Sequence, residues 1–344
     1  MEKDPRRFLL VTTVKDEGPS IVEWVAHHRN LGFTDIIIYQ NDSFDGTAKL
    51  LRTMARQSLI RYFPNPDKKR AWQNKAYRRV SRLEAFARAD WVMVLDGDEF
   101  LSINVGAGRV GDLVDALPEG INSVQLNWKI FGSSFRQTTS DGLVTEDFVW
   151  GEDNARIREK LIGFKPFFKP SVYTRPGIHR PKVLREGMQE SICNGSGIRV
   201  GDFDEKGWRS ADPGLRRLAQ VNHYVIRDAQ RFIIKSDRGR TSNLQRDVAL
   251  TYWNEYELYD EMDLSLARKA PQTRATIKMM DQLCNGRLGF LTYHARRLQR
   301  ERFEMLMADP QYRELYEIIT DSQAHFAPVQ AGAAEHGAPD QVAG

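Results

Sequence analysis

The 344-residue sequence carries 50 basic and 46 acidic residues, for a formal net charge of +4, and 41% of its residues are hydrophobic. This balance is typical of a globular protein and argues against a disordered chain. The excess of positive charge is too small to indicate a polyanionic ligand, so we expect no nucleic-acid partner. The length allows one large domain or two moderate ones.

Two cysteines, Cys193 and Cys284, are too few and too far apart for a disulfide framework or a zinc site. The charged N-terminus, 1–7, lacks a signal-peptide core. No stretch approaches the roughly 20 apolar residues that span a bilayer. The sequence therefore predicts a cytoplasmic protein with no transmembrane segment, and it leaves peripheral contact with the inner face of the membrane open.

Short apolar runs alternate with helix-like segments over the first hundred residues. Runs rich in β-branched residues predict buried strands at 8–14, 35–40, 59–63 and 91–95. Apolar residues at helical spacing predict helices at 21–31, 47–57 and 71–87. Such alternation indicates βαβ units and an α/β fold, with a mainly parallel, Rossmann-like sheet flanked by helices.

The later sequence is less regular. A helix is expected within 106–118, a strand at 123–128, and a strand or turn at 221–225 followed by a basic helix, whereas 131–208 reads as irregular. Segment 247–321 has a helical pattern. We divide the chain into a nucleotide-binding half (1–130), an acceptor-side half (131–240), a helical C-terminal extension (241–323) and a disordered tail (324–344).

The most informative motif is Asp96-Gly97-Asp98, directly after the predicted strand 91–95. Ligands of parallel α/β sheets gather beyond the carboxyl ends of the strands. Two carboxylates one residue apart can hold a divalent cation, which neutralises a leaving diphosphate as a Lewis acid, and Gly97 lets the backbone approach closely. Isolated acidic pairs are common in loops, so this pair indicates a functional site only because it directly follows an apolar strand.

Several motifs occur in an order that is more specific than any one of them. They are Thr13-Val14-Lys15-Asp16-Glu17-Gly18, Glu23-Trp24, His27-His28-x-x-Leu31-Gly32, Tyr39-Gln40-Asn41-Asp42-Ser43-x-Asp45-Gly46-Thr47, Trp91 to Phe100, Trp128-x-x-Phe131-Gly132 and His223-Tyr224. Over about residues 8–240 the chain resembles the family 2-like glycosyltransferases with a GT-A fold, and it shares features with the related family 92-like enzymes. The resemblance implies transfer of a sugar from a nucleotide-diphosphate sugar to an acceptor hydroxyl, with inversion, and with Mn²⁺ or Mg²⁺ as cofactor.

The resemblance also implies roles for single positions. Thr13, Lys15 and Glu17 would line the nucleotide site, and Asn41 and Asp42 would lie near the base or ribose. Gln73 and Lys75 would lie near the nucleotide or its phosphates. Asp96, with Gly97 beside it, and Asp98 would be the ribose and metal positions. The Asn41–Thr47 segment could instead be only a turn and helix cap, and the two lysines could be solvated surface charges.

A metal held by carboxylates and phosphates has coordination positions that an imidazole can fill. His223 is the first candidate ligand and His179 the competitor, although a lone histidine more often has a structural role. Lys235 and Arg238 follow on a basic segment and could reach the diphosphate. A solvated helical face would explain these two residues nearly as well.

An inverting transferase needs a carboxylate to take the proton of the acceptor hydroxyl. The acidic residues of the later half are Glu146, Asp147, Glu152 and Asp153, and we select Glu152. Aromatic side chains such as Trp128 and Trp150 could stack on an acceptor sugar, although core packing explains them at least as well.

Two alternatives to a glycosyltransferase stay open. A nucleotidyltransferase or phosphatase could use the same acidic pair, and the chain could be a catalytically silent sugar-nucleotide-binding or scaffold protein. The sequence does not choose among a glycan, a lipid-linked and a protein acceptor. It also does not identify the donor sugar or the oligomeric state.

Overall fold

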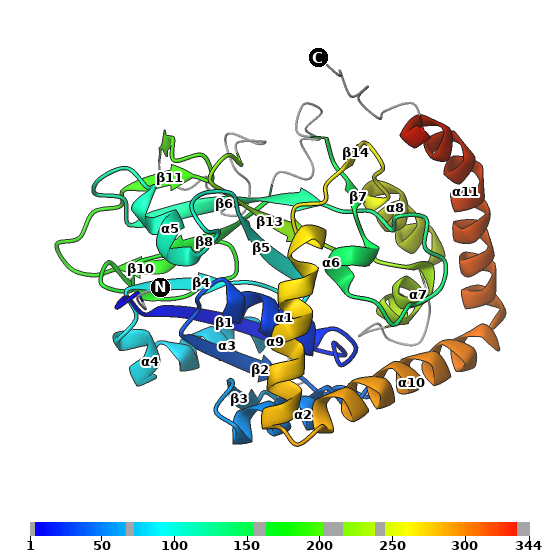
Figure 1. The fold of residues 1–344 in the computed structure, drawn as a ribbon, viewed down its shortest axis with the longest axis horizontal. Helices are drawn as coiled ribbons and strands as arrows, with labels where there is room; N and C mark the ends of the chain where they lie inside the picture. Colours follow the sequence, from blue (N-terminus) through cyan, green and yellow to red (C-terminus); the bar gives the residue numbers. More distant parts are fainter. Residues whose placement is uncertain (1–3, 67–71, 154–162, 202–215, 238–244, 336–344) are drawn as a thin grey trace, which may run out of the picture.

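The computed structural model describes residues 4–66, 72–153, 163–201, 216–237 and 245–335, with side chains described up to residue 324. A ten-stranded sheet forms its centre, with strands in the order β12-β11-β6-β8-β4-β1-β2-β3 and with β5 and β13 attached beside β6 (Figure 1). The strands of this path are β1 (Phe8–Val14), β2 (Asp35–Gln40), β3 (Arg61–Pro64), β4 (Trp91–Val94), β6 (Ser123–Ile130), β8 (Phe164–Phe168), β11 (Ile192–Asn194) and β12 (Arg199–Val200).

The N-terminal side of the sheet is parallel, as predicted. β1 pairs in parallel with β2 and with β4, and β2 pairs in parallel with β3. Every residue of β1 and β4 is buried, which fits their continuous apolar sequence. The three loops that follow β1, β2 and β4 therefore open at the same edge of the sheet.

The later half adds antiparallel strands to the same sheet, so the region predicted to be irregular is partly regular. β8 lies between β4 and β6 and is antiparallel to both. β13 (Ala219–His223) is parallel to β6 and antiparallel to β5 (Glu99–Ile103). This pairing brings the end of β13 to the residues that follow β4. The remaining strands are short: β7 (Trp150–Gly151), β9 (Tyr173–Arg175), β10 (Lys182–Leu184) and β14 (Glu261–Met262).

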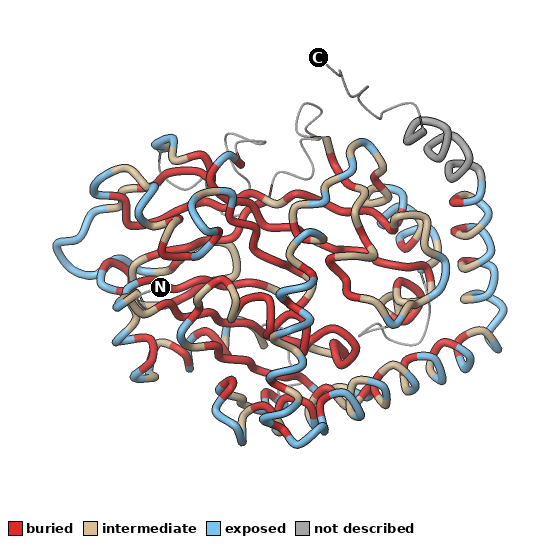
Figure 2. The backbone as a smooth tube through the Cα atoms, viewed as in Figure 1, coloured by how far each residue is buried: buried red, intermediate tan, exposed pale blue. Residues whose placement is uncertain are grey.

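Helices cover the sheet, and most residues of its strands are buried (Figure 2). In the first half these helices are α1 (Ile21–Asn30), α2 (Thr47–Arg56), α3 (Trp72–Val80), α4 (Glu84–Ala87) and α5 (Val110–Asp115). The expected single helix at 71–87 is therefore two helices, because the chain turns at Ser81–Leu83. The helix expected within 106–118 is confined to α5, since Gly106 and Gly108 both have positive φ before it and Pro118 follows it.

The C-terminal part is helical, as predicted, and runs around the outside of the domain (Figure 1). After α6 (Val144–Asp147) and α7 (Ala229–Asp237) come α8 (Arg246–Tyr256), a short 3-10 turn (Ala267–Lys269), α9 (Ala270–Leu283), α10 (Arg287–Met307) and α11 (Pro310–Glu335). α11 includes residues as far as Glu335 and so overlaps the beginning of the segment 324–344, whose disorder stays a prediction. No helix in the described part of the chain is long and apolar enough to cross a membrane.

Candidate functional site

The loop after β4 lies against the loop after β1. A Cβ built on Gly97 would lie 3.0 Å from Cγ of Glu17 and 3.1 Å from Cγ1 of Val14, so only a residue without a side chain fits there without a local shift. Asp16 has a positive φ of 54°, a conformation that aspartate tolerates better than most residues. The loops after β1 and β4 therefore pack directly against each other.

Asp98 faces the end of β13 and helix α7. Its carboxylate lies 3.6 Å from Nε2 of His223 and 3.0 Å from Nζ of Lys235. Lys235 also donates a hydrogen bond of 2.6 Å to the carbonyl of Val225. Burial raises the pKa of Asp98, but the Lys235 ammonium and the neighbouring His223 imidazole outweigh it and hold this pKa well below its usual range. Asp98 is thus an ionised carboxylate beside an imidazole and an ammonium.

Asp96 points to a different set of partners. Its carboxylate accepts a 2.7 Å bond from Nζ of Lys165 and a 3.3 Å bond from Nε2 of Gln73. Lys165 is fully buried on β8 and also lies 3.3 Å from the fully buried carboxylate of Glu99. Burial lowers the pKa of Lys165, but the charges of Asp96 and Glu99 more than reverse this and raise it overall. Lys165 therefore holds the acidic loop through two carboxylates.

Glu99 connects the partners of Asp96 with the partners of Asp98. Its Oε2 accepts a hydrogen bond of 2.8 Å from the backbone N–H of Asp96, and its Oε1 lies 4.0 Å from Nδ1 of His223. Both Oε1 and Nδ1 are buried and have no hydrogen-bond partner in the described part of the chain. Burial raises the pKa of Glu99 to about 7 despite Lys165. The imidazole of His223 thus has one carboxylate on each side, and its ring lies 4.8 Å from the ring of Trp128.

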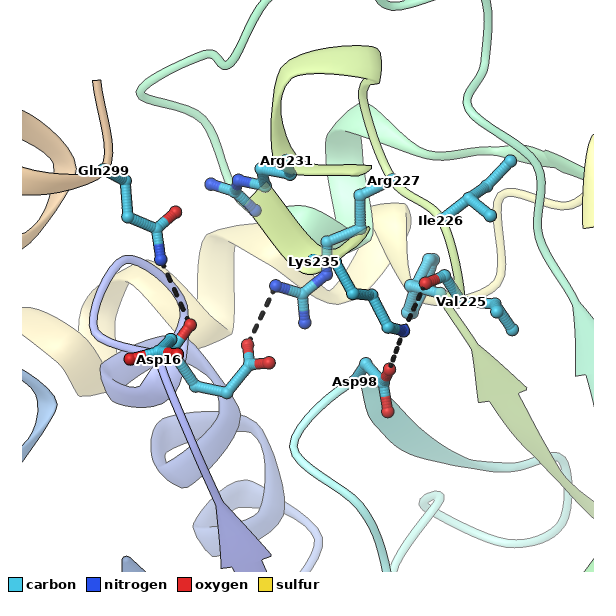
Figure 3. A pocket seen from close by; sticks show the side chains of 10 residues that line it. Asp16, Asp98, Val225, Ile226, Arg227, Arg231, Lys235 and Gln299 are labelled. Carbon is cyan, nitrogen blue, oxygen red and sulfur yellow. Dashed lines mark hydrogen bonds and ion pairs between the residues drawn. The ribbon is translucent and has the colours of Figure 1, made fainter. Parts of the chain in front are cut away.

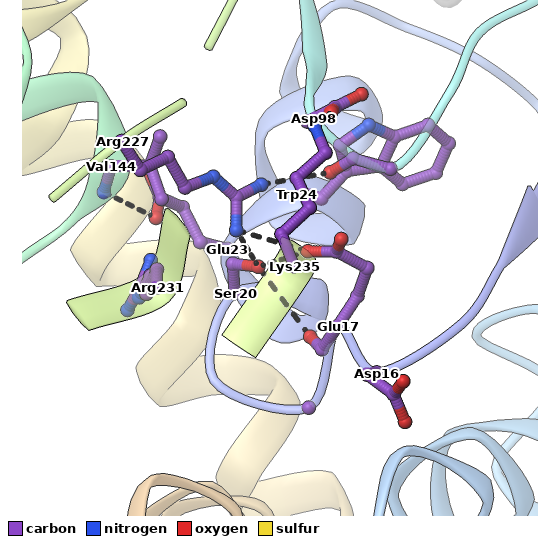
Figure 4. A network of polar contacts seen from close by, with 12 residues as sticks. Asp16, Glu17, Ser20, Glu23, Trp24, Asp98, Val144, Arg227, Arg231 and Lys235 are labelled. Atoms are coloured by element: carbon purple, nitrogen blue, oxygen red, sulfur yellow. Dashed lines mark hydrogen bonds and ion pairs between the residues drawn. The ribbon is translucent and has the colours of Figure 1, made fainter. Parts of the chain in front are cut away.

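Arg227 joins three parts of the chain (Figure 4). Its guanidinium donates bonds of 3.0 Å to Glu17, 3.2 Å to Ser20 and 3.4 Å to the carbonyl of Gly97. Arg227 has a positive φ of 56°, which is costly for a residue with a long side chain. Strained backbone of this kind is concentrated at functional sites, and here it aims the guanidinium between the loops after β1 and β4.

A polar pocket opens where these elements meet, and Figure 3 shows the side chains that line it. Three cations from the segment after β13, Arg227, Arg231 and Lys235, face carboxylates that follow β1 and β4. Gln299 of α10 closes another side and donates to the carbonyl of Asp16 at 3.1 Å. The pocket lining consists of Asp16, Glu17, Asp98, Tyr224, Val225, Ile226, Arg227, Arg231, Lys235 and Gln299.

The other predicted nucleotide-site residues follow β1 and β2 or lie on α3. Thr13 is buried on β1, and Asn41 donates to the carbonyl of Asn65 at 3.2 Å. Lys15 and the exposed Asp42 line a second cavity that lies beside α10. Gln73 and Lys75 are both on α3. Arg238 falls outside the described residues.

Three of the four acidic residues considered for the base form separate ion pairs. Glu146 pairs with Arg274, Asp147 pairs with Arg136 at 2.7 Å, and Glu152 pairs with Arg216 at 2.7 Å. Glu152 is fully buried. Its assignment as the base stays a prediction, and the buried ion pair does not favour it, because a base must reach the proton that it removes.

His179 contacts Phe164 and Trp128. Its ring lies 5.6 Å from that of Trp128, and Nδ1 lies 3.2 Å from the carbonyl oxygen of Phe164. Burial lowers its pKa to about 4. The geometry thus favours His223 over His179 as a partner of Asp98.

Sequence reasoning missed Lys165 and Arg227. A signal for Lys165 was present, because it is the one charged residue in the run Phe164–Phe168, FKPFF, where a lysine has to be buried or paired. Arg227 follows His223-Tyr224 closely, but no periodicity marks it. Its role depends on a backbone conformation that the sequence does not reveal.

The side chains of the site can be compared with the ligands that the expected divalent cation needs. Among the described residues, no three His, Cys, Asp or Glu side chains form a group that could hold a metal ion. Asp98 and His223 provide an oxygen and a nitrogen donor side by side, whereas Asp96 is bound to Lys165. Cations of the Mg²⁺ type are commonly held by one or two carboxylates together with substrate phosphates. Two adjacent donors therefore fit a cation that arrives with a diphosphate.

Three solved structures illustrate what the chain is similar to, each over less than half of its own length. S. aureus TarS 1-349 in complex with UDP is 12% identical, with a TM-score of 0.30 over 48% of this chain and 47% of that chain. Glucosyl-3-phosphoglycerate synthase from Mycobacterium tuberculosis, in complex with Mg²⁺ and UDP, is 18% identical, with a TM-score of 0.25 over 36% and 44%. A mycobacterial protein is 20% identical, with a TM-score of 0.26 over 36% and 41%.

No curated protein sequence matches the chain. A family profile described as "Glycosyltransferase family 92" matches residues 14–210, which is more than half of the chain and includes β2 to β4 and the acidic loop. This match confirms the predicted resemblance, and together with the sheet topology it confirms the GT-A type α/β fold. The chain belongs to glycosyltransferase family 92.

Proposed function

We propose that this protein transfers a sugar from a nucleotide-diphosphate sugar to the hydroxyl group of an acceptor. The observation that carries the proposal is the approach of Asp98 and His223 to within 3.6 Å, at the edge of the sheet where three strand-end loops open. Family membership favours a transferase over a nucleotidyltransferase or phosphatase with the same acidic pair. A glycan, a lipid-linked sugar and a protein remain candidate acceptors.

In this proposal Asp98 and His223 hold a divalent cation, Mn²⁺ or Mg²⁺. When bound, the cation supplies Lewis-acid stabilisation of the diphosphate leaving group. Oε1 of Glu99 lies 4.0 Å from Nδ1 of His223, and in this proposal it would accept a hydrogen bond from that nitrogen when the cation is bound and so keep Nε2 toward Asp98. Lys165 keeps Asp96 and Glu99 in place from the buried side of the loop.

The charges around the pocket suit an anionic donor. Lys235 and Arg227 bring positive charge to the edge where the diphosphate would lie, and Arg227 holds the loops after β1 and β4 together. Cations in a partly water-excluded pocket stabilise developing negative charge without reorganisation. The position of Asp96 beside Gln73 is consistent with contact to the ribose rather than the metal.

The proton of the acceptor hydroxyl needs a base, and Glu152 stays our candidate. Because Arg216 holds Glu152 in a buried pair, it can serve only if acceptor binding opens that pair. We also propose that the configuration of the transferred sugar is inverted, as the resemblance to family 2-like glycosyltransferases implies. The stereochemistry of the product will test it.

The phosphate-containing product that is released distinguishes sugar transfer from nucleotidyl transfer and from phosphate hydrolysis. Purified protein is incubated with UDP-, GDP-, CDP- and dTDP-sugars, with Mn²⁺, Mg²⁺ or EDTA, and nucleoside diphosphate, pyrophosphate and inorganic phosphate are measured. Metal-dependent release of a nucleoside diphosphate with transferred or hydrolysed sugar supports the proposal. Pyrophosphate or inorganic phosphate as the first product would favour the other enzyme classes.

Two variants test the cation site itself. Asp98→Asn and His223→Gln should each lower turnover by at least about a hundredfold, the scale expected when one group that stabilises transition-state charge is removed. Asp115→Asn, an exposed residue paired with Arg6, is the matched control and should be unaffected. Metal-dependent nucleotide binding with no turnover for any donor sugar would favour the silent-binding alternative.

A further inference from the structure

Helices α2 and α10 lie side by side on the surface, and together they form a basic face. The turn before α10 touches α2, because Sγ of Cys284 lies 3.9 Å from the carbonyl oxygen of Thr53. A Cβ on Gly46, at the other end of α2, would lie 3.9 Å from Leu298 and 4.0 Å from His294. The two helices therefore run antiparallel along the lower edge of the molecule in Figure 1.

The outward residues of α2 are all basic. Its buried side is formed by Thr47, Leu50, Leu51 and Met54, so helical spacing turns Lys49, Arg52 and Arg56 to solvent. The sequence of α2, TAKLLRTMAR, contains no acidic residue. None of these three cations has an ion-pair partner in the described part of the chain.

α10 adds aromatic side chains to this charge. Phe290 is 71% exposed and Tyr293 is 59% exposed, whereas Leu288, Ala295 and Gln299 form the buried side. Residues 287–300 of α10 contain four arginines and no acidic residue. Arg296 and Arg300 pair with Asp141 at 3.5 and 3.1 Å, and Arg297 pairs with Glu301 at 3.3 Å. Arg287 is exposed and has no ion-pair partner among the residues described, so it is the cation that α10 adds to the face.

We infer that this α2–α10 face, defined by Lys49, Arg52, Arg56, Arg287, Phe290 and Tyr293, binds the surface of a membrane that contains anionic phospholipids. Basic side chains are attracted to anionic headgroups, and aromatic rings on the same face partition into the interfacial region. A second copy of this chain is a poor partner, because a symmetric contact would bring two basic faces together. This inference does not depend on the proposed transferase activity.

Flotation of the full chain with vesicles tests the inference. Vesicles of phosphatidylcholine are compared with vesicles that contain about 30 mol% phosphatidylglycerol, at low salt and at about 0.5 M NaCl, where screening is strong. We expect the wild type to float with the anionic vesicles only, and the bound fraction to fall at high salt. Failure to float with anionic vesicles, or equal flotation with neutral ones, would overturn the inference.

Two double variants assign the binding to this face. Arg52→Glu with Arg56→Glu, and Phe290→Ser with Tyr293→Ser, should each lower the partition coefficient by at least about tenfold. The controls, Arg88→Glu with Arg185→Glu and the exposed Leu184→Ser, lie just after α4 and around β10 and should bind as the wild type. Thermal unfolding and circular dichroism show that each variant is folded.

Other partners would give different results. If the aromatic double variant abolished a concentration-dependent dimer in light scattering while vesicles bound neither protein, self-association would replace membrane binding. If heparin and duplex DNA bound the wild type but anionic vesicles did not, the face would be a polyanion site. Either result would overturn the inference.

Discussion

The imidazole of His223 lies between two carboxylates, 3.6 Å from Asp98 at Nε2 and 4.0 Å from Glu99 at Nδ1. A histidine with a carboxylate behind it is held in one tautomer and orientation, which is how proteins commonly position a metal-binding imidazole. β13 makes this possible because it pairs with β5, and this register places His223 opposite Glu99. Glu99 is thus a positioning residue in the proposed site.

Glu99→Gln should weaken cation binding without removing a ligand. Loss of a partner behind a metal-binding histidine typically costs about 10–100-fold in metal affinity or activity, and we expect this range for the Mn²⁺ dependence of nucleotide binding. Titration calorimetry of UDP at several Mn²⁺ concentrations would measure it. Glu84→Gln, on the exposed start of α4, is the control. An unchanged Mn²⁺ dependence in a folded Glu99→Gln protein would rule out the positioning role.

Lys165→Met should destabilise the protein in a pH-dependent way. The substitution leaves the fully buried Glu99 without its ammonium partner, and breaking a buried pair costs about 3–5 kcal/mol of unfolding free energy. Without Lys165 the pKa of Glu99 should rise further. A carboxyl group with a raised folded-state pKa favours folding below its unfolded pKa and loses that stability as pH rises. The deficit of Lys165→Met should therefore be larger at pH 8 than at pH 5.

Urea unfolding at both pH values measures this effect. Lys169→Met, which removes a partly exposed ammonium 5.2 Å from the ring of Trp91, is the matched control. A deficit that is equal at both pH values would mean that Glu99 does not take up the proton when Lys165 is lost.

Gly97→Ala tests the close approach of the two nucleotide-site loops. The added Cβ would meet Glu17 at 3.0 Å and Val14 at 3.1 Å, while Glu17 is held by Arg227 at 3.0 Å. Overpacking of this kind costs about 1–3 kcal/mol, and we expect a severalfold loss of nucleotide affinity with it. Gly201→Ala, which has no atom within 4 Å of its Cβ position, should change neither quantity. Nucleotide-induced thermal shifts compare the two variants, and wild-type affinity in Gly97→Ala would show that the loops tolerate separation.

The sequence predicts the first half of the fold well because each element there has a strong local signal. β1, β2 and β4 are apolar runs, and their bounds differ from the prediction by no more than one residue. The antiparallel strands β8 and β13 were not predicted as such, since their pairing partners lie far away in the chain. Strand pairing is set by tertiary contacts, which short segments do not encode.

The candidate site, like the fold, could be predicted only where the signal is local in the sequence. Asp96 and Asp98 could be predicted because a carboxylate pair directly after a buried strand is a local pattern. The separation of their side chains, with Asp96 toward Lys165 and Asp98 toward His223, could not be, because β8 and β13 bring those partners. The roles proposed for Thr13, Lys15, Asn41, Asp42 and Lys75 stay predictions, and binding measurements on single variants will test them.

His27 should make the stability of the protein fall at mildly acidic pH. It is buried on α1, with Nε2 2.8 Å from the carbonyl oxygen of Leu101, and burial lowers its pKa to about 4. The unfolded chain takes up a proton at its ordinary value of 6.5, whereas folded His27 does so only near 4. The unfolded state therefore binds more protons between these values, and the free energy of unfolding decreases as pH falls from 6.5 to about 4.

His27→Gln keeps a donor for the Leu101 carbonyl but cannot titrate. When the pH is lowered, the free energy of unfolding should decrease less for His27→Gln than for the wild type. The difference between the two decreases should reach up to about 3 kcal/mol near pH 4. Part of the pH dependence should remain, because burial also holds the pKa of the neighbouring His28 well below its usual value. Urea unfolding between pH 7 and about pH 4.5 measures the difference, with His294→Gln on the surface of α10 as the control. Parallel curves for His27→Gln and the wild type would mean that folded His27 accepts a proton as readily as the unfolded chain does.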